Sequence, residues 1–503
     1  MHSYVAIYHA NLNYAFLIPE NYERVIRASY EVIIDGHAKV PEAKYVFEAS
    51  GYTIDQMAKL TPDVLAKLRA AIDSGQCEFM GAPYSHPIMA NIPEEDGYWS
   101  CEFAMRAYEK HLGFRPESFW NPECTWMQHV PRAFKRAGVK YLTLDFESYM
   151  TCNDKDYSWV ERNRTHDMSW GGHLPWYDLD PNCPALHRPF RDVVPGLHGF
   201  CRSDRLVGKA LGYFRGEKVS LDELVDNLKH WSGSKDGATI YMADDAEYCG
   251  TTGYYYIKYY GDYSRSFDLD PKAPQLLDAL IRRILEDVGP MATFKEACET
   301  ISPVEAPFFV EDRFAWHRTY ADAWAGTPEA RRWEPTLQSM RTEYRERYQP
   351  IVEGPENQAK FKDIVERFWL HMTNSANSDG RWPPPPNVTC PFNREWVEQE
   401  IAATQAVLAE LKEVTKGMTA PEAAGQGHYD ESDSDYGFHF TDKDPRDIRR
   451  LNNYELQHAI YHYHKMVDSG EADKVANGKA MLKKVFDELD RRGMKGVRPP
   501  SIR

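Results

Sequence analysis

From Met1 to about Thr300, short β-rich runs alternate with helical stretches, and this alternation limits the fold more than any other feature of the sequence. Several of the helical stretches end in glycine, as helices often do. Strands separated by helices are typical of β/α units whose strands form a parallel sheet. The sequence therefore predicts an α/β fold. The β-rich runs are SYVAIY (3–8), AKYVFEA (43–49), CEFM (77–80), ESFW (117–120), KYLTLDF (140–146) and ATIYMA (238–243).

The pattern becomes mostly helical after ISPVEAPFF (301–309), and this change indicates a second unit. We expect a catalytic β/α region over residues 1–300 and a helical domain packed on it over residues 301–416. A polar stretch rich in Gly, Asp and Ser predicts a linker or loop over 417–445. Two amphipathic patterns around Ser469 and Gly470 predict a helical C-terminal extension over 446–503.

Composition and charge exclude several classes of function. The chain of 503 residues has a net charge of −16 and no basic stripe with interleaved aromatics, so we expect no nucleic-acid partner. No apolar run approaches the roughly 18 residues that span a membrane, and the N-terminus does not resemble a signal peptide, so we predict a cytoplasmic protein. The nine cysteines never form Cys-x-x-Cys, which argues against a disulfide framework and a thiolate zinc site. The chain has neither Gly-x-x-x-x-Gly-Lys-[Ser/Thr] nor a Gly-x-Gly-x-x-Gly after a strand, which argues against phosphoryl and nucleotide chemistry.

Ionisable residues follow four of the β-rich runs at the point where each run ends. His9 follows the first run, the segment 81–87 with His86 follows the third, Asn121-Pro122-Glu123 follows the fourth, and residues 244–247 follow the last. In a parallel β/α barrel the loops after the strands converge on one face. We therefore expect two histidines and several carboxylates to meet there.

Glu123 is the candidate nucleophile. It follows a strand-ending Asn-Pro pair and stands between Trp120 and Trp126 in FWNPECTW, so the proline turns the chain and the carboxylate projects between indoles. A helix-capping or simply exposed glutamate is the alternative.

The thirteen tryptophans and thirty-one tyrosines have flat faces with polar rims, which suit a sugar ligand. Glycoside cleavage needs a second carboxyl group to protonate the leaving oxygen, and Asp245 is the candidate proton donor. Crowding by Asp244 and Glu247 in the sequence DDAE would raise at least one pKa. An acidic surface turn is the alternative, and Asp145 and Glu147, after another strand, remain rivals.

Together these motifs resemble glycoside hydrolase family 57. The resemblance rests on FWNPECTW (119–126), VPRAFKRAGVKYLTLDFESY (130–149), GAPYSHPIMANIPEED (81–96) and ADDAEYCG (243–250). It implies an incomplete (β/α)7 barrel followed by a helical domain, with Glu123 as the nucleophile and Asp245 as the acid/base. It also implies a retaining double displacement through a covalent glycosyl-enzyme, with no metal ion and no organic cofactor.

The same resemblance suggests the residues that bind sugar. NSDGRW (377–382) is similar to a stretch of the family's helical domain, so Asp379 and Trp382 would reach back to the substrate. His9 and His86 match histidines of the family, whereas Ala10 and Asn11 replace the Gln-Pro that follows the first of them. Trp120 and Glu247 complete the predicted subsites. The tyrosine-rich run 254–260 is left out, because such runs are more often core.

The substrate that we predict is an α-1,4-glucan or malto-oligosaccharide, cleaved or transferred by an amylase or 4-α-glucanotransferase type of enzyme. Activity on α-galactosides is an alternative within the family. A metal-dependent deacetylase would need His-x-x-x-His, but Ala82 and Ala90 flank His86 at that spacing. A zinc-dependent mannosidase-type site would need His-x-His where the chain has His9-Ala10-Asn11. A non-catalytic carbohydrate-binding protein would have no need of both Glu123 and Asp245. The sequence does not predict an oligomeric state.

Overall fold

The computed structural model describes most of the chain. The residues described are 2–15, 17–153, 180–214, 219–232, 236–251, 267–310, 314–316, 319–382, 391–419, 448, 459, 463, 466–467 and 470–491. Nearly all of the predicted linker, the tyrosine-rich run 254–260 and the histidine pair His458 and His462 of the tail lie outside them.

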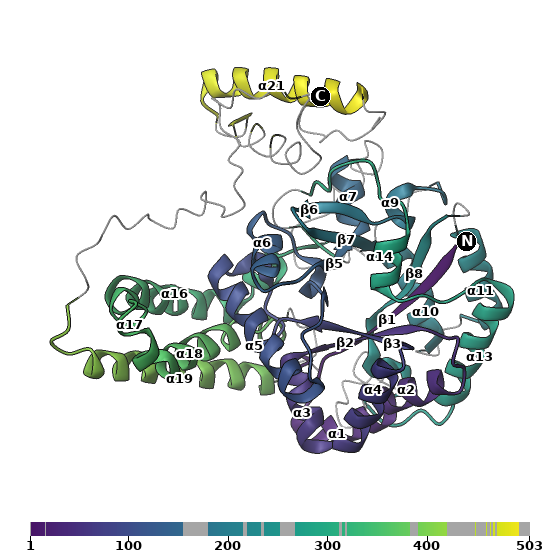
Figure 1. Cartoon of the computed structure of the whole chain (residues 1–503), viewed down its shortest axis with the longest axis horizontal. Coiled ribbons are helices and arrows are strands. Elements are labelled where there is room, and N and C mark those ends of the chain that lie inside the picture. The colour runs from purple at the N-terminus through teal and green to yellow at the C-terminus, as the bar shows by residue number, and fades with distance from the viewer. Residues whose placement is uncertain are drawn as a thin grey trace.

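An eight-stranded sheet forms the body of the molecule, in the order β6-β7-β5-β4-β3-β2-β1-β8 (Figure 1). Seven of these strands run parallel to their neighbours, and β6 is antiparallel to β7 at one edge. Helices surround this curved sheet, which confirms the α/β class and the incomplete (β/α)7 barrel. The strands are β1 (Ser3–Ala10), β2 (Tyr45–Ser50), β3 (Cys77–Ala82), β4 (Ser118–Phe119), β5 (Tyr141–Asp145), β6 (Phe190–Val194), β7 (Leu197–Arg202) and β8 (Ala238–Asp245).

Side-chain alternation along the strands divides the core in two. In β1, Val5 and Ile7 belong to the apolar cluster that fills the barrel, whereas Tyr4 and Tyr8 pack in the cluster on the helix side. Successive side chains of a strand point to opposite faces, so His9 lies on the inner face, two residues beyond Ile7. The sequence pattern thus places His9 at the C-terminal end of the barrel interior.

Helices connect the strands of the sheet, as the alternating pattern predicts. Those of the barrel are α1 (Tyr22–Val25), α2 (Glu31–Ala38), α3 (Gly51–Leu60), α4 (Pro62–Asp73), α5 (Glu94–Leu112), α6 (His129–Arg136), α7 (Phe146–Asn153), α9 (Pro184–His187), α10 (Asp204–Phe214), α11 (Leu221–His230), α13 (Ala273–Asp287) and α14 (Phe294–Thr300). Short 3-10 and π turns are η1 (Pro19–Asn21), η2 (Ile26–Tyr30), η3 (Met89–Asn91), η4 (Pro122–Cys124) and η6 (Ala246–Cys249).

A helical bundle packs against α5 on one flank of the barrel (Figure 1). Its apolar core is separate from those of the barrel, and Phe103 of α5 joins it. The exact domain boundaries stay predictions. The remaining elements are β9 (Phe314–Ala315), β10 (Thr319–Tyr320), α15 (Asp322–Ala325), α16 (Pro328–Glu343), η8 (Tyr344–Tyr348), α17 (Gln349–Val352), α18 (Gln358–Asn374), η9 (Asp379–Arg381), α19 (Pro391–Val414) and α21 (Ala472–Arg491).

The sequence did not predict strands β6 and β7. They form a hairpin whose register pairs Val194 with Leu197, and Gly196 in the turn has φ 73°. Asp192 interrupts β6 with φ 50°, which breaks the alternation by which a strand is recognised. Arg202, at the end of β7, therefore escaped attention as a residue of the barrel mouth.

Among the residues that the structure describes, no helix combines the length and the apolar character that crossing a membrane requires.

Candidate active site

Glu123 lies at the C-terminal end of β4 in a strained backbone conformation. Its φ is 55° and that of Cys124 is 46°, both in the left-handed region that side chains other than glycine rarely adopt. Hydrogen bonds on both sides fix this turn: Asn121 N–H donates to Thr143 Oγ1 at 3.0 Å, and Trp316 N–H donates to the Glu123 carbonyl at 2.8 Å. Strain of this kind persists where the surrounding contacts impose it, commonly at functional sites.

The Glu123 side chain is buried, with 9% of its surface exposed, and one carboxylate oxygen has no hydrogen-bond partner. Burial raises the pKa of this carboxyl well above its usual value, and the charges of Asp379 and Asp244 raise it further. Trp316 and the positive charge of Arg202 act in the opposite direction and favour the ionised form. The carboxylates of three distant segments are therefore close enough in space to affect one another.

The two tryptophans that flank Glu123 in the sequence do not both line the site. Trp120 is fully buried inside the barrel, stacks on His9 with ring centroids 5.0 Å apart and meets Trp316 edge to face at 5.6 Å. Trp126 packs against Phe308 in the core on the helix side. The indoles beside Glu123 are thus Trp120 and Trp316, and the second of them comes from a segment that the sequence did not single out.

The end of β8 carries two adjacent aspartates with different surroundings. In register, His9 of β1 is paired with Asp245, and the Asp245 N–H donates to Asp244 Oδ1 at 2.8 Å. Asp245 is half-buried and Asp244 is buried. The charge of Asp244 acts to raise the pKa of both Glu123 and His9. The structure therefore brings Asp244, in addition to the predicted Asp245, to the end of the barrel where Glu123 lies.

Asn11 donates hydrogen bonds to the two other predicted carboxylates, Glu247 and Asp379. Its backbone N–H donates to Glu247 Oε1 at 2.8 Å, and its side-chain amide donates to Asp379 Oδ2 at 3.0 Å. The Ala15 N–H donates to Asp379 Oδ1 at 2.9 Å, and the Tyr30 hydroxyl donates to Glu247. Burial raises the pKa of Asp379 to about 7 and that of Glu247 to about 8, although these hydrogen bonds act against it.

Asp379 reaches the barrel because the segment before it docks on the loop after β3. The Asn377 side chain donates to the Ser85 carbonyl at 2.7 Å, and the Ser378 N–H donates to the His86 carbonyl at 3.1 Å. His86 itself has φ 51°. Trp382 is half-buried and meets Trp324 edge to face at 5.8 Å.

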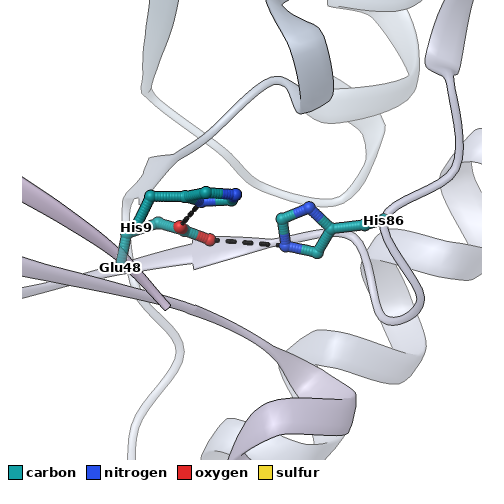
Figure 2. A group of neighbouring side chains, drawn as sticks. All are labelled: His9, Glu48 and His86. Carbon is teal, nitrogen blue, oxygen red and sulfur yellow. Dashed lines mark hydrogen bonds and ion pairs between the residues drawn. The ribbon is translucent and has the colours of Figure 1, made fainter. Parts of the chain in front are cut away.

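His9 and His86 contact Glu48, a residue of β2 that the sequence analysis missed (Figure 2). The three side chains are buried, and each offers a ligand atom within 4.8 Å of the others, so this group could hold a metal ion. Glu48 lies inside an apolar strand. The only sequence feature that could have identified it as a site residue was its position two residues after Val46, which places it on the inner face of the sheet.

The rivals Asp145 and Glu147 belong to a buried charge cluster with Arg202 and Asp204. Arg202 Nη1 contacts Asp204 and lies 3.7 Å from Asp145 Oδ1. The Glu147 carboxylate accepts hydrogen bonds from the Ser203 hydroxyl and the Asp204 N–H. Burial raises the pKa of Asp145 to about 6 and that of Glu147 to about 8. Asp145 lies against the Arg202 guanidinium, and Glu147 accepts hydrogen bonds at the start of α10. These contacts favour a structural role for both carboxyl groups.

Comparison with known proteins identifies relatives for the barrel. The model of glycosyl hydrolase family 57 matches residues 2–268. An α-amylase of Pyrococcus abyssi is 24% identical over 226 residues, which are 45% of this chain and 31% of the relative. A 4-α-glucanotransferase of Thermococcus litoralis is 28% identical over 139 residues, 28% of this chain and 20% of the relative. The chain thus spans about a third or less of the curated relatives it matches.

Solved structures share the fold over a longer part of the chain. A branching enzyme of Thermococcus kodakaraensis in complex with glucose has a TM-score of 0.58 at 12% identity, covering 83% of this chain and 92% of the other. The 4-α-glucanotransferase of Thermococcus litoralis has a TM-score of 0.52 at 17% identity, covering 80% of this chain and 59% of the other. At these identities the likeness concerns the fold.

Proposed function

Because the chain belongs to glycosyl hydrolase family 57, we propose that it is a retaining enzyme that hydrolyses or transfers α-1,4-linked glucose units. The substrate class follows from relatives named α-amylase, 4-α-glucanotransferase and 1,4-α-glucan branching enzyme. One observation supports the chemistry most directly: a buried, strained glutamate with an unpartnered carboxylate oxygen at a barrel strand end. The cytoplasmic location stays a prediction.

In this proposal Glu123 attacks the anomeric carbon and forms a covalent glycosyl-enzyme. The new bond joins its carboxylate oxygen to the sugar, while the bond to the leaving oxygen breaks and Asp245 protonates that oxygen. Asp245 then removes the proton of a water molecule or of a sugar hydroxyl, which attacks the intermediate. Water gives hydrolysis and a sugar hydroxyl gives transfer.

Glu123 must be ionised to attack, and its surroundings oppose this by burial and by the charges of Asp379 and Asp244. The guanidinium of Arg202 supplies the compensating positive charge. In the transition state the sugar develops positive, oxocarbenium-like charge, which the same carboxylates would stabilise. The crowded carboxylates repel one another without substrate, but they favour the transition state.

The sugar-binding residues that we propose are the predicted subsites together with Asn11. Asn11 replaces part of the family's first motif, yet it holds Glu247 and Asp379 at fixed positions. Carboxylates held in this way can accept hydrogen bonds from sugar hydroxyls. The predicted subsites are His9, His86, Trp120, Glu247, Asp379 and Trp382.

The first experiment measures reducing sugar released from soluble starch and the products formed from maltoheptaose. We expect Glu123→Gln to lower kcat by more than about a thousandfold, because the nucleophile is lost. Asp245→Asn should lower it by about 10²–10⁴-fold, the range for a general acid/base. Products longer than maltoheptaose would indicate transfer, and shorter products alone would indicate hydrolysis.

Asp244→Asn is the matched control for the acid/base. Asp244 carries the same charge as Asp245. If Asp245 donates the proton, replacing Asp244 should lower kcat much less than replacing Asp245 does. A larger loss in Asp244→Asn would move the acid/base role to Asp244. Equal activity of Glu123→Gln and the unmodified protein would refute a catalytic role for Glu123.

A further inference from the structure

Three buried side chains from three consecutive parts of the barrel face one another beside the candidate active site. His9 ends β1, Glu48 lies in β2, and His86 lies in the loop after β3. Figure 2 shows the Glu48 carboxylate between the two imidazoles. One of its oxygens contacts His9 Nδ1, and the other lies 3.7 Å from His86 Nε2.

Direct hydrogen bonding satisfies only the His9 side of this group. Glu48 Oε1 and His86 Nε2 are both buried, and neither has a hydrogen-bond partner. The 3.7 Å between them exceeds hydrogen-bonding distance. Buried polar atoms are nearly always paired, so two that face each other across such a gap indicate that another atom belongs between them.

All three side chains of the group are buried. A cation between them would offset the cost of burying the Glu48 carboxylate away from water.

In contrast to the metal-free site that the family resemblance implies, we propose that His9, Glu48 and His86 bind a divalent transition-metal ion, with zinc as the best chemical fit. Two imidazole nitrogens and one carboxylate oxygen suit zinc, whereas calcium and magnesium prefer sites made of oxygen atoms alone. Zinc bonds of about 2.0–2.2 Å place neighbouring ligand atoms about 3.3–4 Å apart, and the 3.7 Å between Glu48 Oε1 and His86 Nε2 lies in this range. Bonds to the ion would replace the direct contact between His9 and Glu48.

The metal would fix the orientation of His9, which two packed indoles connect to the proposed nucleophile. His9 stacks on Trp120 at 5.0 Å, and Trp120 in turn meets Trp316, whose N–H holds the Glu123 carbonyl. The nitrogens that face Glu48 are Nδ1 of His9 and Nε2 of His86, so the second nitrogen of each ring remains for another partner. The inference goes beyond the proposed function, since it needs no particular reaction.

The experiment uses the full chain, stripped with dipicolinate and titrated with Co²⁺, whose visible absorption reports nitrogen and oxygen ligands. We expect about one Co²⁺ per chain, displaced by Zn²⁺ with loss of the absorption. Glu48→Gln, which keeps the shape of the side chain, and His86→Asn should each weaken binding at least tenfold, because each removes one of three ligands.

His371→Ala is the matched control. His371 pairs with Glu400 at 2.6 Å in the helical bundle, an ordinary two-residue histidine–carboxylate contact. This variant should bind Co²⁺ as the unmodified protein does. Thermal unfolding of each stripped variant checks that it is folded.

Failure of this inference is distinct from failure of the proposed function. If the unmodified protein binds no Co²⁺, or if the Glu48→Gln variant binds Co²⁺ as tightly as the unmodified protein, there is no metal at this site, whatever the activity on starch. A protein that binds Co²⁺ through the three residues and does not cleave or transfer glucan retains the metal site and loses the proposed function.

Discussion

Glu123 and His86 both have a left-handed backbone without being glycine, and both lie in loops that follow barrel strands. Such a conformation costs about 1–3 kcal/mol per residue, and it is kept only where neighbouring contacts impose it. For Glu123 these contacts come from Thr143 on β5 and from Trp316. The position of Glu123 therefore depends on residues that lie far from it in the sequence.

Arg202 should set the lower pH limit of activity. Its charge lowers the pKa of Glu123, so replacing it with methionine should raise that pKa further. In the proposed mechanism Glu123 acts as an anion, so activity should be lost as the pH falls through its pKa. We expect the acidic limb of kcat/KM for Arg202→Met to move to higher pH, measured on maltoheptaose. Arg202→Lys, which keeps the charge, should move it less.

Arg205→Met is the control for that measurement. Arg205 lies in α10, three residues after Arg202, and its guanidinium packs over Trp231 at 5.3 Å. Circular dichroism would verify folding, because Arg202 also balances Asp145 and Asp204. An acidic limb that is the same in all four proteins would contradict an electrostatic role for Arg202.

Two elements remote in sequence build the site together. The loop after β3 and the segment that leads into η9 form a bridge between Pro87 and Asn377, in addition to hydrogen bonds at Ser85 and His86. This docking brings Asp379 to the barrel mouth. The helical bundle thereby contributes a carboxylate to the site and has more than a covering role.

Asn377→Ala should loosen that junction. The Asn377 amide donates to Ser85, and its carbonyl oxygen accepts from the Gly380 N–H at 2.8 Å. Losing two buried hydrogen bonds should lower the free energy of unfolding by about 1–3 kcal/mol, seen as a lower urea midpoint. The reduction in kcat/KM should be larger than stability alone explains, because Asp379 is displaced.

Asn182→Ala provides the comparison. Asn182 bonds only locally with Asp180 at the surface among the contacts described, so its loss should change stability by less than about 0.5 kcal/mol. Equal urea midpoints for Asn377→Ala and Asn182→Ala would show that the junction contributes little.

At the scale of the whole molecule, the barrel interior holds an excess of buried acidic groups. Burial raises the pKa of Asp379 to about 7 and that of Glu147 and Glu247 to about 8. An acid whose pKa is higher in the folded than in the unfolded state binds more protons when folded. Its contribution to stability is present at low pH and is lost as the pH rises through the raised pKa.

The protein should therefore become less stable between pH 6.5 and 8.5. Buried histidines with lowered pKa values, such as His9 and His37, act in the opposite sense, but only below their unfolded value near 6.5. Urea unfolding at both pH values measures the change. Glu147→Gln should show a smaller decrease, and a midpoint that rises toward pH 8.5 would contradict the argument.

The strand ends were predictable because their pattern is local. Six of the seven parallel strands, the position of His9 and the turn at Glu123 follow from alternation and from Asn-Pro, which act within a few residues. The hairpin of β6 and β7 was not predicted, because Asp192 breaks its alternation. Glu48 was missed for another reason: an acidic residue inside a strand becomes informative only once its face is known.

The sequence by itself determined the α/β class and, through its resemblance to a family, the choice of Glu123, since each depends on residue types at short spacing. Only the tertiary structure decided which groups surround that glutamate: Trp316 in place of Trp126, Asp244 beside the predicted Asp245, and Arg202 from an unforeseen strand. Charge and hydrogen bonding act over a few ångströms in space, and residues such as Asn11 and Asp379, which are 368 positions apart, meet only when the chain is folded.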